Sequence, residues 1–122
     1  MIEHPQSLAR IHGIFNILNG LWPLVHLRSF EKVFGPKTDE WLVYTVSGMM
    51  MAAGWTQASA RHTGDGQRLA RRLGLGTALT LLTIDLIYVP AGRLKWTYLF
   101  DAAIELGWIL TWVRAATRDV DR

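Results

Sequence analysis

The chain has 122 residues, of which 50% are hydrophobic and 19% charged, and its formal net charge at pH 7 is +3. It contains no cysteine, which excludes disulfides, thiolate metal sites and thiol nucleophiles. The length and the even composition predict a single domain covering residues 1–122.

Charged residues are bunched along the chain. No Asp, Glu, Lys or Arg occurs in residues 11–27 or 41–60, and Asp85 alone interrupts residues 73–92. A helix of about 20 residues crosses the hydrocarbon core of a bilayer, so each gap has the length of one crossing. The spacing predicts an all-α integral membrane bundle of four transmembrane helices in up-down-up-down order.

The first predicted helix has Pro23 near its end, and a loop follows, with an interfacial turn around Phe30 and Phe34. Turn signals at residues 64–66 and 90–92 separate the later elements. The short connection after the second signal predicts an antiparallel return of the last helix. The predicted helices cover residues 8–27, 39–60, 69–89 and 96–117.

Basic residues give this bundle an orientation. Of the 13 Lys and Arg residues, eight fall on the side of the two termini and five on the other side. Because positive loops tend to stay cytoplasmic, the sequence predicts a multi-pass protein of the cell membrane with both termini cytoplasmic. The expected partners are the lipid bilayer and a second copy or a membrane subunit. Nucleic acid is not expected, because the arginines flank the helices.

Two helices carry a polar stripe at alternating spacings of three and four residues, so each stripe lies on one helical face. In the first helix the stripe consists of His12, Asn16, Asn19, Pro23 and His26. In the last helix it consists of Tyr98, Asp101, Glu105, Trp108 and Trp112. These faces are expected to point into a shared interior.

Three acidic residues fall within the predicted spans. Asp85 and Asp101 lie at similar distances from the 90–95 connection, and Glu105 lies one turn further along. Desolvation and mutual repulsion should raise at least one pKa and favour a bound proton, cation or cationic ligand. The candidate ligand-binding or proton-binding residues are Asp85, Asp101, Glu105, His26, Asn19 and Tyr88.

A structural role for these acids is the alternative. Asp85 can pair with Arg93 or Lys95, and Glu105 can bond to Asn19 or a histidine. A metal site built from histidine and carboxylates is chemically possible, but no helix holds a Glu-x-x-His or His-x-x-x-His pair. No metal is therefore expected, and neither a catalytic residue nor a cofactor is assigned.

Pairs of small residues in the second and last helices predict close helix contacts. The pairs are Gly48 with Ala52 and Ala103 with Gly107, each spaced four apart.

Three functions remain open. The first is a membrane protein that binds or transports a proton, cation or cationic hydrophobic ligand through the acidic cluster. The second is a membrane enzyme, isomerase-like, acting on a lipid or terpenoid. The third is an accessory subunit of a larger membrane complex. In outline the chain resembles small four-helix membrane proteins such as the DoxX-like and emopamil-binding-like groups, which place acidic residues within a compact bundle. It carries no diagnostic motif of either group.

Overall fold

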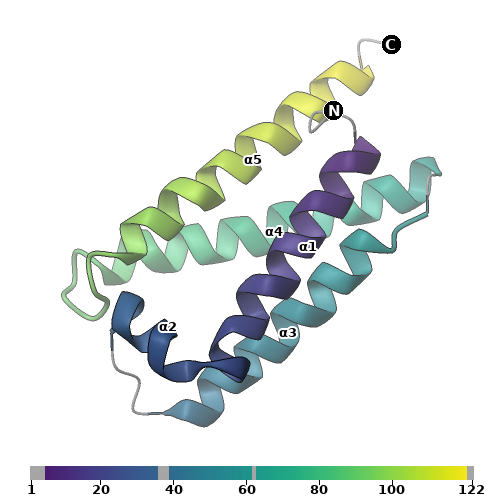
Figure 1. The fold of residues 1–122 in the computed structure, drawn as a ribbon. Coiled ribbons are helices and arrows are strands. Elements are labelled where there is room, and N and C mark those ends of the chain that lie inside the picture. The colour runs from purple at the N-terminus through teal and green to yellow at the C-terminus, as the bar shows by residue number, and fades with distance from the viewer. Residues whose placement is uncertain (1–4, 36–38, 62, 121–122) are drawn as a thin grey trace.

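The computed structural model describes residues 5–35, 39–61 and 63–120, and these form five helices (Figure 1). Their bounds are α1 Pro5–Val25, α2 Leu27–Phe34, α3 Glu40–Ala58, α4 Gly64–Tyr88 and α5 Tyr98–Val120. The all-α prediction is confirmed. The prediction of four helices is wrong, because α2 occupies the segment predicted as a loop with an interfacial turn.

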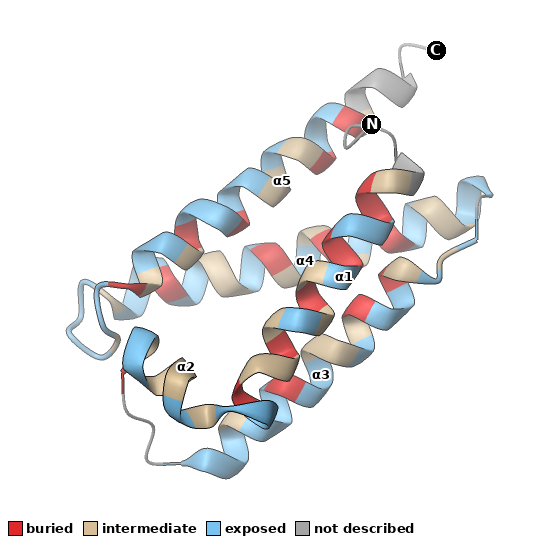
Figure 2. Cartoon of the chain, in the orientation of Figure 1, coloured by how far each residue is buried: buried red, intermediate tan, exposed pale blue. Residues whose placement is uncertain are grey.

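The four long helices form two antiparallel pairs, α1 with α3 and α4 with α5, and α4 crosses α1 at an angle (Figure 1). The pairs meet at the end of the bundle where both termini lie. The main apolar core sits there, and it consists of Leu8, Ala9, Ala70, Trp112 and Ala115. At the opposite end the pairs separate, and α2 lies between them (Figure 2).

Glycines set the close contact between α1 and α3. A Cβ atom added at Gly13 would lie 2.5 Å from the carbonyl oxygen of Gly54, and one added at Gly20 would lie 2.6 Å from that of Ser47. Both glycines of α1 are seven residues apart, so they lie on one face two turns apart. This face brings the two backbones together without side chains between them.

A short helix follows α1 because the chain bends at His26, whose backbone φ and ψ are −148° and 77°. The His26 ring accepts a hydrogen bond from the backbone N–H of Ser29 and caps the new helix. Trp22 of α1 donates to the Ser29 hydroxyl at 2.8 Å. The rings of Phe30 and Phe34 pack edge-on against the Trp22 ring, which holds α2 across the end of α1.

No helix in the described parts of the chain is both long enough and apolar enough to cross a membrane. Amide and imidazole side chains such as Asn16 and His12 lower the apolar character of segments that carry no formal charge, and the mean hydropathy of the chain is only +0.15. The integral membrane bundle is therefore a wrong prediction. The predictions of a polytopic membrane protein that acts as a transporter, an enzyme or an accessory subunit are wrong for the same reason. The predicted multi-pass location with cytoplasmic termini is wrong as well.

Two further predictions need correction. Gly48 and Gly107 meet no atom within 4 Å of an added Cβ, so the predicted small-residue pairs do not bring helices of this chain together. The helix predicted from residue 69 begins at Gly64, because the Thr63 hydroxyl caps it by accepting from the backbone N–H of Gly66. The turn signal at residues 64–66 is therefore the first turn of a helix.

Candidate functional site

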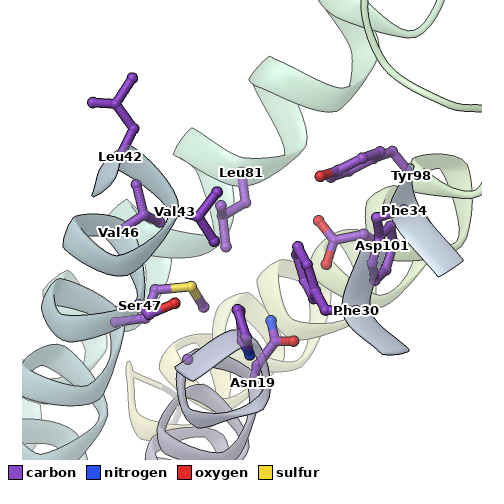
Figure 3. Close-up of a pocket in the computed structure, with 13 residues that line it drawn as sticks. Asn19, Phe30, Phe34, Leu42, Val43, Val46, Ser47, Leu81, Tyr98 and Asp101 are labelled. Atoms are coloured by element: carbon purple, nitrogen blue, oxygen red, sulfur yellow. The ribbon is translucent and has the colours of Figure 1, made fainter. Parts of the chain in front are cut away.

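A cavity of about 260 Å³ opens between the two helix pairs, at the end where they separate. Its walls come from α1, α2, α3, α4 and α5, and most of them are apolar side chains. Thirteen residues line it: Asn19, Gly20, Pro23, Phe30, Phe34, Leu42, Val43, Val46, Ser47, Met50, Leu81, Tyr98 and Asp101. Figure 3 shows aliphatic side chains of α3 and α4 on one side and Phe30, Phe34, Tyr98 and Asp101 on the other.

The position of α2 creates this cavity. The Thr97 hydroxyl donates to the backbone carbonyl of Val33, and the Lys95 ammonium donates to that of Lys32 at 3.2 Å. Phe34 packs against Tyr98 with ring centroids 4.6 Å apart. These contacts tie α2 to the start of α5, so the two helix pairs are held apart by a short helix instead of closing on each other.

Three carboxyl groups meet beside the cavity. Asp85 of α4 is 2% exposed and Glu105 of α5 is 0% exposed, whereas Asp101 is half-buried and lines the cavity. The side chains of Asp85 and Glu105 both lie within hydrogen-bonding reach of Asp101. The sequence prediction that Asp85 and Asp101 lie level with each other is confirmed.

Burial controls the protonation of this cluster. Desolvation, the hydrogen bond with Asp101 and the charge of Asp101 raise the pKa of Asp85 to about 8. Desolvation, followed by the charge of Asp101 and the hydrogen bond with it, raises the pKa of Glu105 to about 9. Asp85 and Glu105 are therefore mostly protonated at neutral pH, and each can donate its proton to Asp101.

Tyr98 shares this environment. Desolvation and the charges of Asp85 and Asp101 raise the pKa of its phenol to about 12, so the hydroxyl keeps its proton. No lysine or arginine of the described residues is among the groups that shift the pKa of Asp85 or Glu105. The expected pairing of Asp85 with Arg93 or Lys95 is thus not formed, and Lys95 bonds to α2 instead.

A second polar cluster lies nearer the termini, around the buried ring of His12. Its Nδ1 accepts from the indole N–H of Trp112 at 2.9 Å and pairs with the amide nitrogen of Gln57 at 3.1 Å. Gln57 also accepts from the Asn16 amide at 2.7 Å. The His12 ring stacks on Trp108, with centroids 4.3 Å apart. Burial lowers the pKa of His12 to about 4, so it is neutral at physiological pH.

The structure gathers some of the sequence-predicted site residues and separates others. Asn19 and Asp101 line one cavity, with Asp85 and Glu105 next to Asp101. His26 is exposed and caps α2, and Tyr88 is exposed at the end of α4. Neither lines the cavity.

Sequence reasoning did not place the aromatic rings of α2 at the site. Phe30 and Phe34 are spaced one helical turn apart, which was the available signal, but their segment was expected to lie at an interface outside the bundle. Ser47 lines the cavity because α3 packs on Gly20, a contact that no sequence pattern predicts.

No family model, curated protein or solved structure matches the chain. Among the described residues, no group of three or more His, Asp or Glu side chains is placed to hold a metal ion.

Proposed function

We propose that this protein binds a small, mainly apolar molecule in the cavity between α2, α3 and α5, with a polar group of the ligand at Asp101. One observation carries the proposal: an apolar cavity of about 260 Å³ with a carboxyl-bearing wall at one end. Sites for small molecules are typically concave and apolar, with a few polar groups that fix orientation.

The contacts around the cavity support binding over a purely structural role for the carboxyl cluster. Burial of a carboxyl group is costly, and Asp85 and Glu105 are 2% and 0% exposed with a third carboxyl group, that of Asp101, within hydrogen-bonding reach. Buried carboxyl groups with raised pKa values beside a cavity are typical of functional sites. Asp101 is the member of the cluster that a ligand can touch, because it lines the cavity.

A cavity-filling substitution tests the proposal. Leu81→Trp places a large ring in the cavity, whereas Leu79→Trp makes the same change at a position of the same helix that is 58% exposed. The probe is 2-naphthol, a neutral two-ring molecule, and binding is measured by saturation-transfer NMR. We expect the wild type and Leu79→Trp to bind the probe equally and Leu81→Trp to lose at least tenfold in affinity.

Equal binding by all three proteins, or binding by none, contradicts the proposal. Val43→Phe fills the cavity from α3 and replaces Leu81→Trp if that variant fails to fold by circular dichroism.

A further inference from the structure

We propose, resting on the function above, that the ligand carries an alkylated ammonium group, held between the rings of Phe30, Phe34 and Tyr98 and the carboxylate of Asp101.

The aromatic rings form one connected wall. The centroids of Phe30 and Phe34 are 5.2 Å apart, and those of Phe34 and Tyr98 are 4.6 Å apart. Figure 3 shows the Asp101 side chain among these rings, and all four residues line the cavity. A cation within about 6 Å of an aromatic face is attracted by the negative face of the ring, and several rings around one ammonium form an aromatic cage.

The charge of the site selects a cation over a neutral or anionic group. Asp101 acts as a negative charge on Asp85, Glu105 and Tyr98, the titratable groups that surround it. No basic side chain of the described chain takes part in these interactions. An anionic group would be repelled there and would lose its hydration, whereas an ammonium supplies the missing countercharge.

The apolar lining favours an alkylated ammonium over a small inorganic cation or a primary ammonium. A metal ion needs several oxygen or nitrogen ligands, and the described residues offer no such group. A primary ammonium has three N–H donors that each need an acceptor. Methyl groups on nitrogen replace those donors with apolar surface, which suits rings and aliphatic walls, and they leave the positive charge for Asp101.

The test uses two probes of the same shape. The first is 4-fluorobenzyltrimethylammonium, and the second is 4-fluoroneopentylbenzene, in which a carbon atom replaces the charged nitrogen. Affinities are measured by fluorine NMR on the intact protein. We expect the wild type to bind the cation about tenfold more tightly than its neutral counterpart. Asp101→Asn should lower the cation's affinity about tenfold and leave the neutral probe's affinity unchanged.

Ring substitutions separate the cage from the charge. Tyr98→Phe keeps the ring and should leave the preference for the cation within twofold, whereas Tyr98→Leu removes it and should reduce that preference at least threefold. Phe34→Leu serves the same purpose if Tyr98→Leu fails to fold.

The outcomes distinguish the two proposals. If both probes bind with equal affinity, or if Asp101→Asn leaves the cation's affinity unchanged, the ammonium assignment is wrong while the binding cavity stands. If neither probe binds but 2-naphthol does, the ligand class is wrong. If Leu81→Trp leaves the binding of every probe unaltered, the cavity itself is not the site and both proposals fall.

Discussion

Polar side chains are arranged differently at the two ends of the bundle. At the closed end, where the helix pairs meet, Gln57 joins Asn16 to His12, and Trp112 donates to the same imidazole. At the cavity end, where α2 lies between the pairs, the side chains of Asp85 and Glu105 lie within hydrogen-bonding reach of Asp101, and Tyr98 shares this environment.

The closed end is the more fully hydrogen-bonded of the two, although Nε2 of His12 and Oδ1 of Asn16 have no partner among the described residues. Buried amide and imidazole groups with defined partners specify one packing arrangement, and they are expected to affect stability when changed. The carboxyl groups at the other end lie beside a cavity that Asp101 lines, so a molecule that enters the cavity changes their surroundings. The polar stripes of α1 and α5 therefore have one role at the closed end of the bundle and another at the cavity end.

The largest expected effect is a loss of stability with rising pH at the cavity end. In the folded protein the pKa values of Asp85 and Glu105 are about 8 and 9, above their ordinary values of 3.8 and 4.5, so their contribution to stability is present at low pH and is lost as pH rises. The pKa of His12 is lowered from 6.5 to about 4, so below pH 6.5 this residue has the opposite effect, and its contribution to stability grows as pH rises. We therefore expect the free energy of unfolding to fall as the pH rises from 6.5 to 8.

Urea unfolding across this range measures the fall. Glu105→Gln removes one titrating group and should halve the slope, whereas Asp65→Asn, at an exposed residue, should leave it unaltered. Asp101 and Tyr98 face the same carboxyl groups, so neither residue is changed in these variants. A stability that is flat or rises between pH 6.5 and 8 would show that the carboxyl groups are solvated.

A smaller effect is expected from breaking the closed end. Gln57→Leu keeps the volume of the side chain and removes its hydrogen bonds with Asn16 and His12. We expect a loss of about 2–3 kcal/mol, because the Asn16 amide is left buried without a partner. Thr56→Val, at the exposed neighbouring position, should change stability by less than about 0.5 kcal/mol. Equal effects of both variants in urea unfolding would mean that the network is not a source of stability.

Much of the helical structure could be predicted from the sequence, because helix periodicity and turn residues are local signals. The tight connection after α4 and the level positions of Asp85 and Asp101 follow from counting residues. The membrane location was wrong because gaps in formal charge were treated as apolar spans. Exposed apolar side chains of α5 made this helix resemble a membrane span, although Asp101 and Glu105 interrupt it. These side chains are Leu106, Leu110 and Val113.

The cavity could not be predicted, because it depends on how far the two helix pairs separate. That separation is set by α2, whose Phe34 contacts Tyr98 64 positions away in the chain. A periodic pattern identifies the face of each helix but carries no information about rotation or distance between helices. The carboxyl cluster was therefore found from its chemistry, and the rings around Asp101 only from the structure.

The smallest expected effects contrast a glycine inside the closed end with one outside it. A Cβ at Gly54 would lie 2.4 Å from the backbone oxygen of Gly13, so Gly54→Ala must push α1 and α3 apart. We expect it to cost about 1–2 kcal/mol even after the gain in helix propensity. Gly107 has open space around it, and Gly107→Ala should stabilise the protein by about 0.5–1 kcal/mol. Thermal unfolding of the Gly54→Ala and Gly107→Ala variants tests this contrast. A stabilising Gly54→Ala would mean that α1 and α3 are not in backbone contact, and the closed end would then be as open as the cavity end.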